Sequence, residues 1–106
     1  MADTIRVMRD GRKDLYFQGD ILAELNYSDG SHTRLYNTES GKFVLAIRDV
    51  DEEGTFDDNA QVFDRVADLV SYLDTRYGVF SYTMKSLFSS AQEKMPELRQ
   101  YFAEEV

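Results

Sequence analysis

The sequence predicts an α+β fold, in which an antiparallel β-meander of three or four strands is followed by two C-terminal helices. Residues 1–49 supply the meander, and residues 50–106 supply an acidic loop and the helices, so that 1–106 form a single domain. Three observations predict this fold. Apolar residues fall at odd positions through the first half, glycines recur at the spacing of hairpin loops, and helical periodicity begins near residue 62.

The strands are predicted from the shared parity of the apolar residues. Alternate residues of a strand face the same side, so one parity persists through several hairpins only if each loop has an odd number of residues. Residues 9–11, 28–30 and 39–41 each end in glycine and fit a three-residue loop, a type I turn followed by a left-handed glycine. The odd-numbered apolar residues are Ile5, Val7, Leu15, Phe17, Ile21, Leu25, Leu35, Phe43, Leu45 and Ile47.

These loops also set the expected strand register. Residues 12–27 form one long strand, or two strands bent at Gly19. Residues 14–20 contain Leu-Tyr-Phe-Gln-Gly, the recognition sequence of a viral protease used to remove expression tags, but the register makes them native strand. The expected pairs are Ile5 opposite Leu15, Leu25 opposite Thr33, and Leu35 opposite Leu45.

The first helix is predicted over residues 62–77, where apolar side chains recur three and four positions apart. Gly78 stands where a helix-ending glycine is expected. The N-terminal cap is Asp58, Asn59 or Asp64, and Asp64 in that role leaves residues 60–63 as a short edge strand.

The second helix is predicted from an apolar stripe that begins at Phe80 and ends at Phe102. Pro96 interrupts this stripe. Because the residue before a proline resists the α conformation, we expect a kink or a break near Met95.

Net charge is −8, and it is placed unevenly. Residues 49–106 carry thirteen acidic and five basic side chains, whereas residues 1–48 are neutral. Such asymmetry is typical of an acidic interaction region or of a solubilising surface on helices. The chain has no cysteine and no apolar run long enough to span a membrane, and no secretory signal opens it, so we expect a cytoplasmic protein.

The inventory of reactive side chains predicts a protein that is not an enzyme and needs no cofactor. His32 is the only histidine, and the sequence lacks a nucleophile elbow, a P-loop and a dinucleotide-binding glycine motif. No catalytic residue is therefore assigned.

One motif resembles a metal site. Over residues 49–60, acids fall at the first, third, fifth and ninth positions of an EF-hand calcium loop, with Gly54 at the sixth. Ala60 replaces the bidentate glutamate of the twelfth position, so the alternative is a solvated acidic connection. The candidate calcium ligands are Asp49, Asp51, Glu53 and Asp57.

The even-numbered face of the sheet is the candidate partner-binding surface. Arg6 opposite Asp14 and Arg34 opposite Glu24 predict cross-strand ion pairs, and the overall acidity disfavours nucleic acid as a ligand. The apolar residues of this face need cover from the second helix, from another protein, or from a second copy of the chain. The candidate contact residues are Tyr16, Leu22, Arg34, Tyr36 and Val44, with Leu22 opposite Tyr36 and Tyr36 opposite Val44.

Three segments resemble small uncharacterised bacterial proteins named for a C-terminal EXLDI motif. They are YFQGDILAEL, RLYNTESGKFVL and VFDRVADLVSYL, and the chain ends in Glu104-Glu105-Val106, similar to the first three positions of that motif. The resemblance implies a bacterial, intracellular protein and no particular activity.

These observations favour a small acidic, non-enzymatic interaction or regulatory protein that acts through protein–protein contacts. One alternative is an acidic inhibitor of the kind encoded by phages, which imitates nucleic acid through the carboxylates of residues 49–106. The other alternative is a weak calcium-binding protein that uses residues 49–60.

Overall fold

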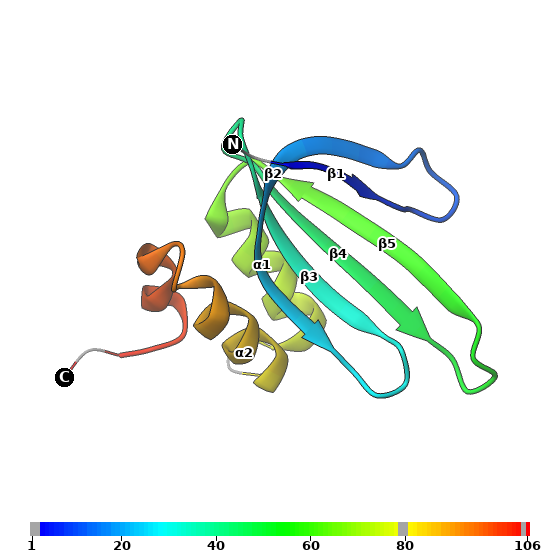
Figure 1. Ribbon diagram of the computed structural model, residues 1–106. Helices are drawn as coiled ribbons and strands as arrows, with labels where there is room; N and C mark the ends of the chain where they lie inside the picture. Colours follow the sequence, from blue (N-terminus) through cyan, green and yellow to red (C-terminus); the bar gives the residue numbers. More distant parts are fainter. Residues whose placement is uncertain (1–2, 79–80, 105) are drawn as a thin grey trace.

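A computed structural model describes residues 3–78, 81–104 and 106, and it has the predicted α+β class (Figure 1). Its sheet contains five strands, not three or four, and each strand pairs antiparallel with the next one along the chain. The strands are β1 (Asp3–Val7), β2 (Leu15–Asn26), β3 (His32–Thr38), β4 (Phe43–Val50) and β5 (Phe56–Phe63).

The additional strand is β5, which begins inside the predicted acidic loop and extends to the start of the predicted first helix. Asp51 N donates to Thr55 O over 2.9 Å and Gly54 N donates to Asp51 O over 3.1 Å, which closes a three-residue loop at residues 52–54. Gly54 has φ of +85°, the left-handed conformation that this loop requires. The prediction of an acidic loop without strand was therefore wrong, because the same turn chemistry recurs here in an acidic setting. The alternative that made residues 60–63 a short edge strand is confirmed, and that strand begins earlier, at Phe56.

Two of the three predicted hairpin loops are confirmed, those at residues 28–30 and 39–41. Tyr27 N donates to Ser31 O over 2.9 Å, and Thr38 N donates to Lys42 O over 2.8 Å. The loop predicted at residues 9–11 is longer, since β1 ends at Val7 and β2 begins at Leu15. Ile5 therefore lies opposite Phe17 instead of Leu15.

A β-bulge in β2 changes the register between Ile21 and Ala23. Beyond the bulge the predicted pairing of Leu25 with Thr33 is confirmed, as is that of Leu35 with Leu45 between the next two strands. Before the bulge the register is shifted by one, and Ile21 lies opposite Tyr36. The prediction that Leu22 lies opposite Tyr36 was wrong, because one inserted residue moves every preceding side chain to the other face.

The helical part comprises α1 (Val66–Tyr77), α2 (Tyr82–Ala91) and the 3₁₀ helix η1 (Pro96–Tyr101). The first helix starts later than predicted because β5 extends to Phe63, and Arg65 is its N-cap in place of Asp58, Asn59 or Asp64.

The predicted end of the first helix at Gly78 is confirmed, with φ of +92°. The predicted break near Met95 is confirmed too, so the second predicted helix is divided into α2 and η1. Phe80, its expected start, lies outside the described residues. No helix in the described part of the chain has the length and hydropathy needed to cross a membrane.

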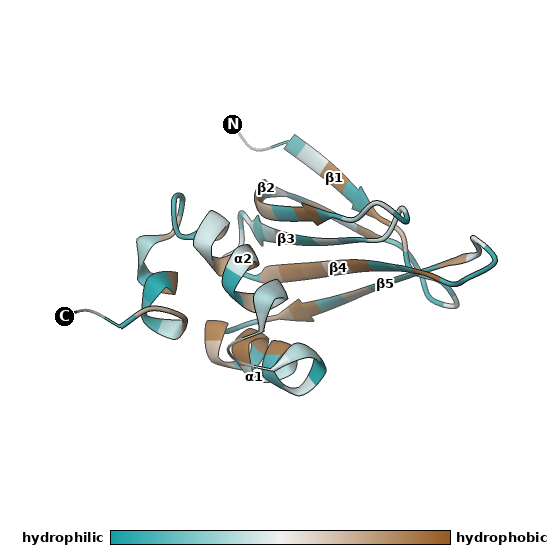
Figure 2. Ribbon diagram, turned by 90° about the horizontal axis from the view of Figure 1, so that it is seen from below, coloured by the Kyte–Doolittle hydropathy of each residue, from teal (hydrophilic) through white to brown (hydrophobic). Residues whose placement is uncertain are grey.

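One core lies between the sheet and the helices, which Figure 2 shows together on one side of the sheet. α2 lies against β2, and η1 lies against α2. Apolar residues at odd positions of β3 and β4 and the inner faces of the helices fill this helix-side core. Its buried members are Leu22, Ala23, Leu35, Phe43, Leu45, Ile47, Leu69, Leu73, Met84, Leu87, Phe88, Ala91 and Leu98.

A second core lies on the opposite face of the sheet. Tyr36 and Val44, expected to need cover from a helix or a partner, are covered instead by β1 and the first half of β2. Phe17 meets the Tyr36 ring edge-on, with 5.5 Å between centroids. The buried members of this concave-side core are Val7, Tyr36, Val44, Ala46 and Ala60, with Ile5, Leu15, Phe17 and Ile21 packed against them.

The first prediction concerns Gly19, which lies in the ladder between Asp3 and Thr38. A Cβ at this position would overlap the backbone carbonyl oxygen of Asn37. Gly19→Ala should therefore lower the free energy of unfolding by about 3 kcal/mol, at the upper end of overpacking costs, because backbone has to move. Urea denaturation measures the change.

Gln18→Ala, an exposed neighbour on the same strand, is the control and should change the free energy of unfolding by less than about 0.5 kcal/mol. Equal stability of the two variants would contradict the close approach of β2 and β3.

Candidate interaction surface

The loop that follows β1 meets the other edge strand, β5, at Asp10 and Asp58. Asp10 N donates to Asp58 O over 2.8 Å, and Asp58 N donates to the Asp10 carboxylate over 2.8 Å. In the described part of the chain, no strand pairing joins β1 to β5. The curled sheet is therefore closed at Asp10 and Asp58 and open beyond them.

This closed end is held by a buried ion pair. Asp58 is 8% exposed, and Arg48 donates to it through Nε over 2.7 Å and Nη2 over 2.9 Å. The guanidinium group of Arg48 also stacks over the Phe56 ring, 4.1 Å from its centroid. The hydrogen bonds to Asp58 raise the pKa of Arg48, and the two bonds fix the start of β5.

Beyond Asp58, no strand pairing joins the outer edge of β5 to another described segment, and this edge is accessible at Val62. In an antiparallel ladder, the N–H and C=O of one residue point to the same side, and the side alternates along the strand. Asp58 points both groups at Asp10, so Ala60 and Val62 point theirs to the same side of β5. Ala60 is covered there, with 1% exposed, whereas Val62 is accessible, with 44% exposed. An exposed edge of this kind is a template for pairing with another chain.

An apolar hollow of about 340 Å³ lies beside this open edge. Val62, which is 44% exposed, and Val44 line one side, and Leu15 and Phe17 of β2 line the other. The remaining lining residues are Tyr16, Gln18, Thr38, Glu39, Ser40 and Lys42. We call the edge at Val62 and the hollow together the β5 wedge, which is defined by Val62 and these lining residues.

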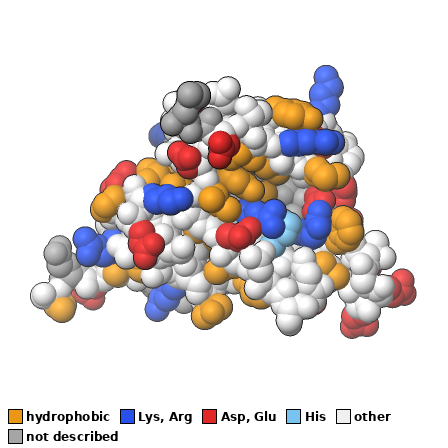
Figure 3. Space-filling view, viewed as in Figure 1, with side chains coloured by type: hydrophobic (Ala, Val, Ile, Leu, Met, Phe, Trp, Pro, Cys, Tyr) orange, Lys and Arg blue, Asp and Glu red, His pale blue; other side chains and the backbone are white. Residues whose placement is uncertain are grey.

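A second hollow of about 140 Å³ lies at the closed end and is lined by basic side chains (Figure 3). Arg34, Arg48 and Arg6 line it with His32, the single histidine, which Figure 3 shows in pale blue between blue side chains. Each arginine has a carboxylate partner: Arg34 pairs with Glu24, Arg48 with Asp58, and Arg6 with Asp14 over 2.7 Å. Both predicted cross-strand ion pairs are thus confirmed as contacts, and the hollow has no excess positive charge for an anion.

The residues predicted to bind a partner are divided between different surroundings. Tyr16 is 67% exposed and Arg34 is partly exposed, while Tyr36 (8% exposed) and Val44 (2% exposed) belong to the concave-side core. Leu22 lies in the helix-side core, on the other face. Of the five, Tyr16 and Val44 line the apolar hollow.

Sequence reasoning missed the exposed residue that completes the hollow, Val62. The helical spacing of Val62 to Val66 and Leu69 favoured the first helix, and an edge strand over residues 60–63 was only the alternative. The signal for a strand was Gly54, which is placed after Asp51 as Gly30 and Gly41 are placed after Tyr27 and Thr38.

The four candidate calcium ligands belong to the β4–β5 hairpin. Asp49 lies opposite Asp57 and pairs with Arg76 over 2.9 Å. Asp51 Oδ1 accepts the N–H groups of Glu53 and Thr55, both over 2.9 Å, as an aspartate does in a turn. Within the described residues, no three Asp, Glu or His side chains form a group that could hold a metal ion.

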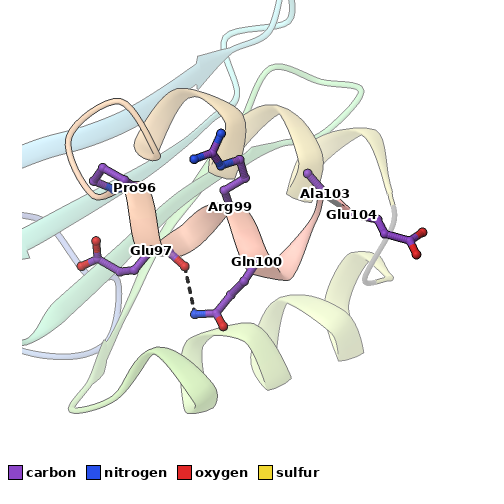
Figure 4. A pocket seen from close by; sticks show the side chains of 6 residues that line it. All are labelled: Pro96, Glu97, Arg99, Gln100, Ala103 and Glu104. Atoms are coloured by element: carbon purple, nitrogen blue, oxygen red, sulfur yellow. Dashed lines mark hydrogen bonds between the residues drawn. The ribbon is translucent and has the colours of Figure 1, made fainter. Parts of the chain in front are cut away.

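A further hollow follows one side of η1 (Figure 4). Its lining comes entirely from residues 96–104, and Figure 4 shows Arg99 and Gln100 pointing in opposite directions. Gln100 Nε2 donates to the Glu97 backbone oxygen over 3.0 Å. Because these polar groups do not converge, the hollow offers no arrangement for catalysis.

No protein-family model, no curated protein and no solved structure matches this chain. The resemblance to the EXLDI proteins stays a prediction, and functional inference depends on the geometry of the β5 wedge.

The second prediction tests whether Tyr36 belongs to the core of the monomer. Tyr36→Ala removes a ring that packs against Phe17 and should lower the free energy of unfolding by about 3 kcal/mol. Tyr82→Ala, at a position 77% exposed, is the matched control and should be near neutral. Chemical denaturation and light scattering together decide the matter. A variant of unchanged stability but reduced oligomeric mass would place Tyr36 in an interface instead.

The third prediction concerns His32. Burial lowers the pKa of His32 below 6.5, and Arg34 and Arg48 lower it further, against the opposite effects of Asp58 and Glu24. The unfolded chain therefore takes up this proton first as the pH falls, and stability is lost between the ordinary pKa and the folded one. His32→Gln should lack this loss. The stability difference between wild type and His32→Gln, measured in urea at pH 7.5 and at pH 5.5, should shift against the wild type at the lower pH. A constant difference would show that folding does not perturb His32.

Proposed function

We propose that this protein is a small acidic, non-enzymatic interaction module that binds an extended segment of another protein in the β5 wedge. The observation that carries the proposal is the outer edge of β5, which is unpaired beyond Asp58 and is flanked by Val62 and the apolar hollow. Addition of a strand to an exposed sheet edge is a recurring mode of peptide recognition.

Two kinds of contact would hold the bound segment. Its backbone would pair with the outward N–H and C=O groups of Val62, which supplies affinity without sequence preference. Every second side chain would face the hollow between Val62 and Phe17, which supplies specificity for apolar residues. The ion pair of Arg48 and Asp58 holds the start of β5 in place, so little ordering is needed on binding.

The nucleic-acid mimic is the less well supported alternative. Mimicry requires carboxylates on one continuous face, but the acidic side chains of residues 49–106 are distributed over the β4–β5 hairpin, α1 and η1. Asp49, Asp58 and Asp68 are also neutralised by arginines of the same chain. The calcium alternative has no assembled ligand group in the described residues. We also propose that the protein is bacterial and cytoplasmic. This part of the proposal rests on the cysteine-free composition and on the family resemblance.

The fourth prediction tests this site with a random peptide library displayed on phage and panned against the purified protein. Peptides should be enriched whose affinity falls at least tenfold on Val62→Lys, because lysine on an edge strand blocks pairing and fills the hollow with charge. Tyr82→Lys adds the same charge at an exposed position of α2 and should leave binding unchanged. Circular dichroism confirms that both variants are folded. Enriched peptides that bind both variants equally, or no enrichment at all, would overturn the proposed site.

A further inference from the structure

We infer that a single large aromatic side chain, of the kind that tryptophan provides, anchors the segment that docks in the β5 wedge. This inference rests on the proposed function and names the chemistry of the partner. It follows from the short accessible part of the β5 edge and from the size and lining of the hollow beside it.

The accessible part of the edge allows only a short backbone contact. The outward groups of Asp58 are taken by Asp10, and Ala60 is covered, which leaves Val62 as the accessible outward-pointing residue of β5. Two hydrogen bonds to Val62 would replace two hydrogen bonds to water, so their net contribution to binding is small. Burial of a side chain must therefore supply most of the affinity.

The position opposite Val62 is the one that carries this side chain. Residues directly opposite each other on neighbouring antiparallel strands have their side chains on the same face, and Val62 shares the concave face with Val44. The next positions of the docked segment on that face lie two residues away, beside the covered Ala60 or beyond the end of β5 at Phe63. One anchor is therefore expected, at the position next to the hollow.

The hollow has room for a large ring. Its volume is about 340 Å³, whereas a cavity of about 150 Å³ is enough to take up benzene. A valine or leucine would leave much of this space to water. An indole ring would bury more apolar surface against Leu15, Phe17 and Val44.

The lining suits an uncharged side chain that has an apolar body and a polar tip. The charged residues that line the hollow are Glu39 and Lys42, one of each sign, so the lining favours neither a cation nor an anion. Tryptophan has a ring N–H that needs an acceptor when the ring is buried. Polar residues with acceptor oxygens stand among the apolar ones of the lining, and they are Gln18, Thr38, Glu39 and Ser40.

The size of the wedge indicates a short segment of another protein as the occupant. Ten residues line the hollow, whereas each side of a stable interface between folded proteins has about 20–30 residues. The chain contains no tryptophan, so a tryptophan anchor does not come from a second copy. Each copy also has a net charge of −8, which opposes the approach of two copies.

The fifth prediction is tested with three heptapeptides that differ only in the central residue, which is tryptophan, leucine or alanine between threonines and serines. Fluorescence anisotropy of the dye-labelled peptides measures affinity. The tryptophan peptide should bind the wild type and Tyr82→Lys equally, at least tenfold more tightly than the other two peptides do. Its affinity should fall at least tenfold on Val62→Lys, which carries the same added charge as Tyr82→Lys.

The absence of tryptophan from the protein allows a second measurement. The tryptophan emission of the unlabelled peptide comes from the anchor alone, and it should move to shorter wavelength when the ring enters the hollow. An emission that stays unchanged in the bound peptide would overturn the anchor.

The outcomes separate this inference from the function on which it rests. Binding of the leucine peptide as tight as that of the tryptophan peptide, with both lost on Val62→Lys, would overturn the aromatic anchor and leave strand addition at β5 intact. Binding of the tryptophan peptide that is insensitive to Val62→Lys would overturn both the inference and the proposed site. If none of the three peptides binds, the inference is wrong, and the peptide library of the fourth prediction decides the proposed site separately.

Discussion

The architecture depends on the single inserted residue in β2, between Ile21 and Ala23. Strand side chains alternate with a period of two, so one extra residue moves all preceding side chains to the opposite face of the sheet. The second half of β2 therefore contributes Ala23 and Leu25 to the helix side, while the first half contributes Leu15 and Phe17 to the concave side. One strand thus serves two cores, and the helices need to cover only one face. The bulge carbonyl of Ile21 accepts a hydrogen bond from Lys94 Nζ over 2.6 Å, which ties the helical layer to the point where the sheet changes face.

The curl that follows from the bulge creates the wedge. By folding β1 back over the concave face, it brings the end of β1 to the start of β5, where Asp10 and Asp58 exchange two hydrogen bonds. Continued pairing of β1 with β5 would close a barrel and leave no free edge. Closure stops at this contact instead, and the further residues of β5 are left beside a hollow that opens onto the concave-side core. The extent to which the sheet curls therefore determines the site. The ion pair between Arg48 and Asp58 holds one end of it in place.

The sequence predicted local structure well where a single residue determines it. Glycine is needed for a left-handed residue, so the loops ending at Gly30 and Gly41 and the end of α1 at Gly78 were predictable. Pro96 likewise predicted the break before η1.

The features that were missed depend on residues that come together only in the fold. No pattern of parity reveals a bulge, because Ile21, Leu22 and Ala23 are all apolar and fit either face. The turn at Gly54 was interpreted through its acids as a metal loop, and Val62 fits helix and strand spacing equally. The β5 wedge was missed for the same reason, since its sides are Leu15 and Phe17 from one end of the sheet and Val62 from the other.

The acidic residues of the second half of the chain bear on how the edge of β5 avoids aggregation. An exposed strand edge with an accessible valine promotes indiscriminate pairing and aggregation, which proteins resist by placing charge along it. Here the charge is of one sign, because residues 49–64 contain acids and no basic residue. Charge of a single sign repels further copies of the chain, since each copy carries the same charge. Specificity is a difference between affinities, and these carboxylates lower the affinity of the chain for its own copies.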